Sequence, residues 1–254
     1  MSGGKKSSID RAFIVHLERA VERRPQVDRL IDRLPVDAHV IPAIDGSKQN
    51  AAMRKCYVRN LLKPRYPFAL RDAEIATFMS HRKCWQYIVD EGLESALIVE
   101  DDVEIDRTDF DRALDVVSRN IEQGDLIRFP IRPRETARRT IAFGAIALFQ
   151  PDRIGLGMVA QIVTAEAAKR LLERTTQFDR PVDTYLQLEW DHGVRVRTLW
   201  PSGVEEVSEN LGGSLIGTPM TIHKKLRHEI LRPIYRLQLK IAARRHRKTY
   251  EKTH

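Results

Sequence analysis

The sequence contains little cysteine and no long apolar run. Its two cysteines, Cys56 and Cys84, lie too far apart to form a disulfide framework or a cysteine metal site, so both are interpreted as structural thiols. The longest apolar run, Ile141 to Phe149, is far shorter than the roughly 20 residues that a membrane-spanning helix requires. The first nine residues lack the apolar core of a secretory signal. These features predict a cytoplasmic protein.

The composition predicts a globular chain rather than a disordered one. Hydrophobic residues make up 42% of the 254 residues and charged residues 31%, which is enough apolar material for a sizeable core. The length suits one α/β domain with appendages. We expect a disordered amino terminus over residues 1–10, a main domain over residues 11–210, and a linker with a basic helix over residues 211–254.

The net charge of +8 is concentrated near the carboxyl terminus. Residues 224–248 contain ten Lys or Arg and one acid, so this segment carries +9 and the rest of the chain −1. Apolar residues recur there at steps of three and four, which predicts an amphipathic helix over residues 221–248 that Pro233 can kink. The apolar positions are Ile222, Leu226, Ile230, Ile234, Leu237 and Ile241.

Two placements of this basic helix remain open. It can bind an anionic membrane surface through its apolar stripe and basic flanks. Alternatively, it can pack on the core with its basic face in solvent. Nucleic-acid binding is not expected, because no aromatic stacking platform accompanies the charge.

Short apolar runs alternate with helical patterns along the chain. This alternation predicts βαβ units and a largely parallel sheet. We expect residues 47–70 to be irregular, residues 130–140 to form a loop, and Asp72 to cap the helix that follows it. The predicted strands are residues 12–17, 38–44, 96–99, 125–129, 141–150, 157–164 and 194–199, and the predicted helices are residues 20–34, 72–90, 108–121, 165–174 and one that begins at Pro181.

The most informative stretch is Ala96 to Asp102, in which four apolar residues are followed by three acids. The apolar part is typical of a strand buried on both faces, and open α/β sheets bind ligands at the carboxyl ends of such strands. Alternation along the strand places Glu100 and Asp102 on one side and Asp101 on the other. Such carboxylates suit Mg²⁺ or Mn²⁺. The alternative is a solvated acidic turn.

One helix carries a histidine on its apolar stripe. Phe78, His81, Trp85 and Ile88 follow one another at steps of three and four residues within the predicted helix 72–90. From the pattern alone, a lone histidine in this position is interpreted as a satisfied core residue.

The same segments carry a resemblance to a known family. The stretch from Ala73 to His81, followed by Trp85 and then by Ala96 to Val103, is similar to the densest motifs of glycosyltransferase family 25. This family comprises lipooligosaccharide and lipopolysaccharide sugar transferases whose animal relatives galactosylate collagen. The resemblance runs from about Ala12 to Glu206. Weaker matches are Phe13 to Arg19, Ile44 to Gly46, Ala165 to Leu172, and Pro181 to Tyr185, and two departures are His16 in place of an asparagine and Gln161 in place of a tyrosine.

The resemblance implies a GT-A-like α/β fold and a metal-dependent, inverting transfer of a sugar. The implied donor is a nucleotide sugar, a UDP-hexose, and the implied acceptor is the lipid-linked core oligosaccharide of lipopolysaccharide or lipooligosaccharide. A transferase that extends a lipid-linked acceptor has reason to bind the membrane, so with its basic helix the protein is expected to be peripheral on the cytoplasmic side of the inner membrane. The expected site residues include Asp102 as ligand of Mn²⁺ or Mg²⁺, Glu100 at the metal or the ribose, and Asp183 as catalytic base or further metal contact. His81 is expected near the phosphates or behind the acidic turn, Arg19 and Arg23 near the phosphates, and Asp45 at the base or ribose.

Each of these assignments has a structural alternative. Asp183 can simply favour the start of a helix, Asp45 can serve a turn, and Arg19 can be solvated. Asp191 and His192 are alternatives to Asp183. Two other functions also remain open: a metal-dependent phosphodiesterase that uses the acidic cluster, and a non-catalytic membrane- or nucleic-acid-binding module with a basic tail.

Overall fold

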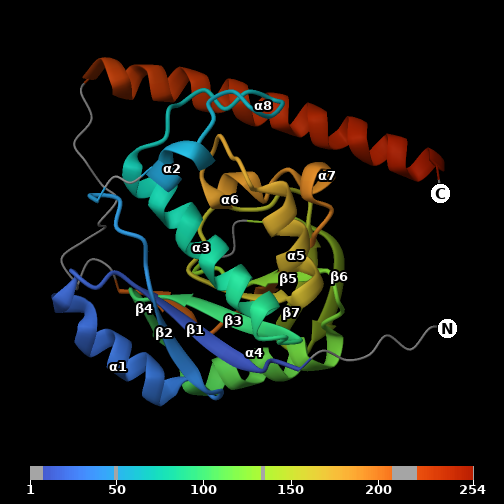
Figure 1. The fold of residues 1–254 in the computed structure, drawn as a ribbon. Helices are drawn as coiled ribbons and strands as arrows, with labels where there is room; N and C mark the ends of the chain where they lie inside the picture. Colours follow the sequence, from blue (N-terminus) through green and yellow to red (C-terminus); the bar gives the residue numbers. More distant parts are fainter. Residues whose placement is uncertain (1–7, 49–50, 133–134, 208–221, 254) are drawn as a thin grey trace.

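The centre of the molecule is an eight-stranded sheet with the strand order β2-β1-β3-β8-β5-β9-β7-β6 (Figure 1). The computed structural model describes residues 8–48, 51–132, 135–207 and 222–253. A separate small sheet pairs β4 with β10. The strands are β1 (Arg11–His16), β2 (Ala38–Pro42), β3 (Ser95–Glu100), β4 (Val103–Ile105), β5 (Asp125–Arg128), β6 (Ala137–Phe143), β7 (Ile146–Pro151), β8 (Ala160–Thr164), β9 (Arg195–Trp200) and β10 (Val204–Glu206).

The strand directions bring several chain segments to one edge of the sheet. β1 is parallel to β2 and β3, and β5 is parallel to β9, whereas β7 and β8 run against their neighbours. Six of the eight strands therefore point the same way, which confirms the predicted mostly parallel sheet. Because β8 is antiparallel to β3, it begins where β3 ends, and the backbone N–H of Glu100 donates to the carbonyl of Val159 at 2.9 Å.

Helices cover both faces of this sheet. α3 and α5 pack on one face, and α1 and α4 pack on the other (Figure 1). The rings of Phe78 and Phe178 stack in the first layer with centroids 3.9 Å apart. Cys84 is fully buried there, and this burial raises the pKa of its thiol to about 12, as a structural role predicts. The helices are η1 (Val21–Arg23), α1 (Arg24–Arg33), α2 (Ala51–Cys56), α3 (Asp72–Asp90), α4 (Arg107–Asn120), α5 (Ala165–Arg174), α6 (Val182–Tyr185), α7 (Glu189–His192) and α8 (Ile222–Thr253).

Several local predictions were wrong. Residues 47–70 contain α2, and β6 begins at Ala137, inside the expected loop. The single strand expected over residues 141–150 is a hairpin of β6 and β7 that turns at Gly144, whose φ of +62° favours glycine. α3 does begin at Asp72, but its N-cap is Arg71, whose backbone N–H donates to the Glu74 side chain at 2.8 Å. The short strands β4 and β10 were not predicted.

The carboxyl-terminal helix α8 lies across one end of the body, beyond α6 and α7 (Figure 1). It packs through Tyr235 and Leu239, which are buried, and the guanidinium of Arg180 donates to the Tyr235 hydroxyl at 2.8 Å. Among the described residues, none of the helices has the length and apolarity needed to cross a bilayer.

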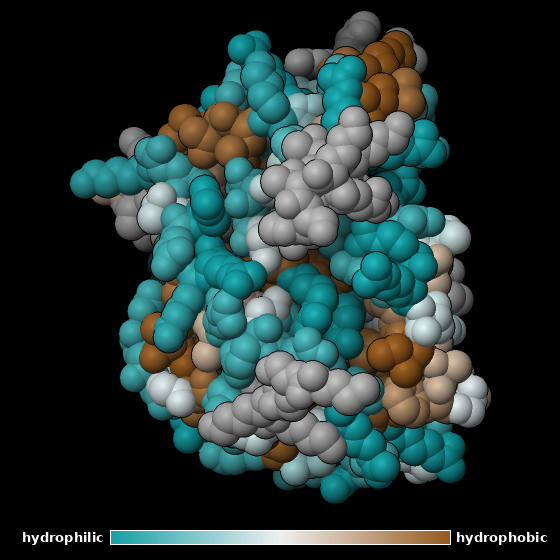
Figure 2. Space-filling model, turned by 90° about the vertical axis from the view of Figure 1, so that its right-hand side faces the viewer, coloured by the Kyte–Doolittle hydropathy of each residue, from teal (hydrophilic) through white to brown (hydrophobic). Residues whose placement is uncertain are grey.

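The stripe predicted from the sequence is not the packing face of α8. Four of its members are about half exposed, and the helix continues through Pro233. The side chains of Ile222 and Leu226 lie outside the described part of the chain. The visible surface in Figure 2 is mostly hydrophilic and is interrupted by separate apolar patches. α8 therefore presents two apolar faces, one toward the core and one toward solvent. The exposed members are Ile230, Ile234, Leu237 and Ile241.

Candidate active site

A pocket of about 150 Å³ opens where β1, β2 and β3 end. α3 forms its wall, and the acidic turn after β3 forms its floor. The turn after β2 lies close to this wall, since a Cβ on Gly46 would come within 2.8 Å of the Ala73 backbone. The pocket therefore needs glycine at this position. Its polar lining residues are Arg19, Arg23, Ser47, Thr77, Ser80, His81, Glu100, Asp101 and Asp102.

The three acids of the turn have different roles. Asp101 is 5% exposed, and its two oxygens bond His16 Nδ1 and Arg23 Nη1, each at 2.7 Å. Arg23 also reaches Asp102 at 3.2 Å. Asp101 thus holds the turn in place, while Glu100 and Asp102 line the pocket.

The electrostatics of Asp102 fit a cation site. Burial and the neighbouring Glu100 carboxylate raise the pKa of Asp102 to about 6, and Arg23 only partly opposes this shift. A divalent cation near the two carboxylates would remove this repulsion. No group of three His, Cys, Asp or Glu side chains that could hold a metal by itself is found in the described ranges. Mg²⁺-type sites commonly use one or two carboxylates and take their remaining ligands from phosphates and water, so Glu100 and Asp102 fit such an ion.

His81 lies in the core directly beside the acidic turn. It is 1% exposed, and its Nε2 lies 3.6 Å from Glu100 Oε1. Its Nδ1 lies 3.0 Å from Gln161 Nε2. His81 is therefore a core residue that also supports the acidic turn from behind.

The two departures from the family pattern both contact this turn or its support. His16 bonds Asp101, and Gln161 bonds His81. The sequence reasoning assigned no role to either side chain. Both residues differ from the family pattern inside motifs that otherwise match, and this difference was the signal that could have identified them.

Arg19 and Asp45 face each other at the mouth of the pocket. Arg19 Nε donates to Asp45 Oδ2 at 3.1 Å. The backbone N–H and hydroxyl of Ser47 bond the other oxygen of Asp45, and these bonds lower the pKa of Asp45. Asp45 therefore serves its turn, as the alternative expected. Arg19 lines the pocket.

Asp183 does not line the pocket. It lies on α6, where one oxygen accepts from the backbone N–H of Gly157 at 3.0 Å and the other from that of Thr184 at 2.6 Å. Gly157 stands just before β8, which begins at the same edge of the sheet as the acidic turn. Asp183 thus lies outside the pocket lining and is bonded to a segment that leads to the same edge of the sheet.

The two alternatives to Asp183 belong to the packing of α7. Asp191 accepts from the Tyr185 hydroxyl at 2.7 Å. His192 is buried with its Nε2 3.0 Å from the Leu186 carbonyl, and burial lowers its pKa to about 4. Neither lines the pocket.

A comparison with protein families identifies the family of this chain. The model of "Glycosyltransferase family 25 (LPS biosynthesis protein)" matches residues 9–186, which is more than half of the chain. The chain belongs to glycosyltransferase family 25. The acidic turn, α3 and the start of α6 all fall within the matched range.

This family 25 chain spans about a third or less of the length of the curated relatives that it matches. It is 32% identical to a glycosyltransferase 25 family member of Drosophila melanogaster, covering 73% of this chain and 31% of the relative. It is 30% identical to human procollagen galactosyltransferase 2, and this match covers 48% of this chain and 20% of the relative. It is also 26% identical to human inactive glycosyltransferase 25 family member 3, and this match covers 73% of this chain and 32% of the relative.

Two solved structures show low likeness. A mannose-1-phosphate geranyltransferase from Thermus thermophilus has a TM-score of 0.35 at 12% identity, covering 76% of this chain and 73% of that one. The inositol-1-phosphate CTP transferase from T. maritima has a TM-score of 0.37 at 10% identity, covering 80% and 91%. At these scores neither likeness bears on function.

Proposed function

We propose that this family 25 chain is a metal-dependent, inverting glycosyltransferase and that the pocket at the ends of β1, β2 and β3 holds a nucleotide-sugar donor, a UDP-hexose. The observation that carries the proposal is that the three acids of the turn have different contacts. Asp101 is consumed in holding the turn, and Glu100 and Asp102 line the pocket with repelling charges. A solvated acidic turn would not require this buried support.

The residues around the pocket have distinct tasks in the proposal. Glu100 and Asp102 would hold Mn²⁺ or Mg²⁺, which stabilises the charge that develops on the leaving nucleoside diphosphate. Arg19 and Arg23 line the same pocket and would contact the donor phosphates. His81 positions Glu100 through the contact between their side chains. The protein thus supplies a preorganised cationic and metal-binding environment for the leaving group.

Asp183 is our candidate for the catalytic base. Inverting transfer requires a carboxylate that accepts the proton of the acceptor hydroxyl on the face opposite the leaving group. Asp183 is bonded to Gly157, in the segment that leads into β8 beside the acidic turn. This attachment supports a place at the acceptor side of the pocket.

For the acceptor we propose the lipid-linked core of lipopolysaccharide or lipooligosaccharide. The printed description of the matching family names lipopolysaccharide biosynthesis, while relatives named procollagen galactosyltransferases make collagen the second candidate. The exposed stripe of α8 lies among basic residues and complements an anionic bilayer, which favours the lipid-linked acceptor. Such a protein would be peripheral on the inner face of the inner membrane. The basic residues are Arg232, Arg236, Lys240, Arg244 and Arg245.

Calorimetry separates this function from its alternatives. We expect UDP to bind more tightly with Mn²⁺ than without it, and GDP to bind less well. A panel of sugar nucleotides assayed for turnover then identifies the donor. Cleavage of a phosphodiester substrate without sugar transfer would indicate the phosphodiesterase. Absence of any nucleotide binding would indicate the non-catalytic module.

Membrane binding is tested with substitutions on the exposed face of α8. Ile234→Asp with Leu237→Asp should abolish salt-sensitive binding to phosphatidylglycerol vesicles, because it removes apolar area from the stripe. Both residues are about half exposed, so the fold should remain. Ile141→Asp, a similarly exposed site on β6, is the matched control. Unchanged vesicle binding of the double variant would reject the membrane-bound helix.

A further inference from the structure

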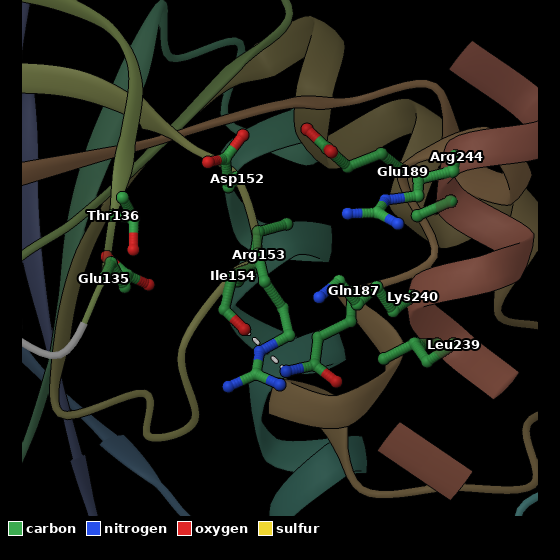
Figure 3. A pocket seen from close by; sticks show the side chains of 11 residues that line it. Glu135, Thr136, Asp152, Arg153, Ile154, Gln187, Glu189, Leu239, Lys240 and Arg244 are labelled. Atoms are coloured by element: carbon green, nitrogen blue, oxygen red, sulfur yellow. Dashed lines mark hydrogen bonds between the residues drawn. The ribbon is translucent and has the colours of Figure 1, made fainter. Parts of the chain in front are cut away.

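A second cavity of about 330 Å³ lies between the body and α8. Figure 3 shows Glu135 and Thr136 on one side of it, with Gln187 and residues of α8 on the other. Its volume falls within the range of small-molecule sites, about 300–1,000 Å³. None of the tasks assigned to the donor pocket uses this cavity.

One buried carboxylate at this cavity has an unused oxygen. The side chain of Glu135 is 4% exposed, and its Oε1 accepts from both Arg128 and the backbone N–H of Gly155. Its Oε2 is buried and has no hydrogen-bond partner among the described residues. Buried polar atoms are nearly always hydrogen-bonded, so this oxygen is suited to a donor group of a ligand.

The rest of the lining mixes hydrogen-bond donors and acceptors. Arg153, Lys240 and Arg244 supply donors, while Asp152 and Glu189 supply acceptors. The carboxylates would repel a nucleoside diphosphate, whereas a sugar hydroxyl both donates and accepts and can use such a mixed lining. The lining therefore favours a neutral, hydroxyl-rich ligand.

One chain segment links the wall of the cavity to the donor pocket. Asp152 to Ile154 line the cavity, and the same segment continues through Gly157, which bonds Asp183, to Val159, which bonds Glu100. The chain segment that lines the cavity is therefore hydrogen-bonded both to Asp183 and to the acidic turn.

A row of side chains makes a second connection. Arg128, the partner of Glu135, is paired in register with Gln161, which bonds His81 beside Glu100. On these grounds we propose that the cavity binds the acceptor saccharide, an inference that rests on the proposed glycosyltransferase function.

The test uses the full chain with UDP and Mn²⁺ and a panel of methyl glycosides of galactose, glucose, mannose and N-acetylglucosamine. Saturation-transfer NMR detects which glycosides bind. Ala243→Trp fills the cavity from α8, so binding should be lost. Lys240→Ala removes one charged donor and should weaken binding about tenfold. Lys169→Ala, at an exposed lysine of α5 outside the lining, is the matched control and should bind as the unmodified protein does.

The affinity for UDP in the presence of Mn²⁺ distinguishes the two proposals. Unchanged UDP binding with lost glycoside binding in Ala243→Trp supports the acceptor cavity. If UDP binds the unmodified protein but no glycoside does, or if both cavity variants bind glycosides normally, the cavity inference is wrong and the donor site stands. If UDP itself fails to bind, the proposed function fails. Should Ala243→Trp not fold, the comparison of Lys240→Ala with Lys169→Ala decides.

Discussion

The donor pocket differs from the cavity between the body and α8, here called the α8 cavity, in how its charged groups are paired. The charged groups of the donor pocket are largely paired with one another, as in the set of His16, Arg23 and Asp101. The α8 cavity retains a buried carboxylate oxygen on Glu135 with no partner among the described residues. Internal pairing fixes the geometry of a site before a ligand arrives, whereas an unsatisfied buried group gains its partner from the ligand. Each of the predictions below tests one side of this contrast.

The largest effect is expected for Asp102→Asn. An amide in place of a carboxylate removes much of the attraction for a hard cation, so sugar transfer should fall by about 10³-fold or more and UDP binding should lose its dependence on Mn²⁺. Transfer assays and calorimetry measure both. Asp111→Asn, an exposed carboxylate on α4, is the control. Near-normal activity of Asp102→Asn would end the metal-site proposal.

The next largest effect tests the pairing within the donor pocket. Asp101→Ala leaves the buried Arg23 and His16 without their shared partner, which should lower the free energy of unfolding by about 3 kcal/mol or more. Urea denaturation measures it. Asp111→Ala removes an exposed ion pair with Arg107 and should cost less than about 1 kcal/mol. Equal losses in the two variants would show that Asp101 is not the structural centre of the turn.

Asp183 stands between the two regions. If it is the base, Asp183→Asn should lower turnover by about 10²-fold while UDP affinity changes little. Asp191→Asn, which alters only the bond to the Tyr185 hydroxyl, should retain most of the turnover. A parallel loss of UDP affinity would make Asp183 a metal or nucleotide contact. A larger loss in Asp191→Asn would reassign the base.

The smallest effect concerns the helix beside the α8 cavity. His192 in α7 has its pKa lowered to about 4, so the unfolded chain binds a proton at higher pH than the folded one. Stability should therefore decline as the pH falls below about 6.5, by about 2 kcal/mol at about pH 5. Urea denaturation at both pH values should show this decline to be smaller in His192→Gln. Identical pH dependence in both proteins would exclude His192 as its source.

The sequence allowed the donor pocket to be predicted far better than the α8 cavity. Glu100 and Asp102 lie at the carboxyl end of β3, and the turn of Asp45 follows β2. Only β1 separates these two parallel strands in the sheet, so their carboxyl ends lie close together. The lining of the cavity comes from four separate segments, and no local period relates Glu135 to Lys240. Side-chain contacts such as Gln161 with His81 likewise depend on register between distant elements.

The carboxyl-terminal helix shows why periodicity alone was insufficient. The stripe of Ile230, Ile234, Leu237 and Ile241 was predicted as the apolar face, but tertiary packing uses Tyr235 and Leu239. A pattern of steps of three and four identifies an apolar face, not the surface that will cover it. The tyrosine acts through a hydroxyl that pairs with Arg180, a contact that hydropathy does not encode.

The direction of β8 also sets an order of assembly. The acidic turn ends a strand whose two neighbours are β1, made early, and β8, which is complete only at Thr164. During synthesis the turn therefore leaves the ribosome long before the backbone of Val159 can close its edge. Pairings between distant segments are slow to form, and an open strand edge exposed in the meantime can pair with other chains. Until β8 pairs with β3, the strand that carries the acidic turn is therefore an open edge.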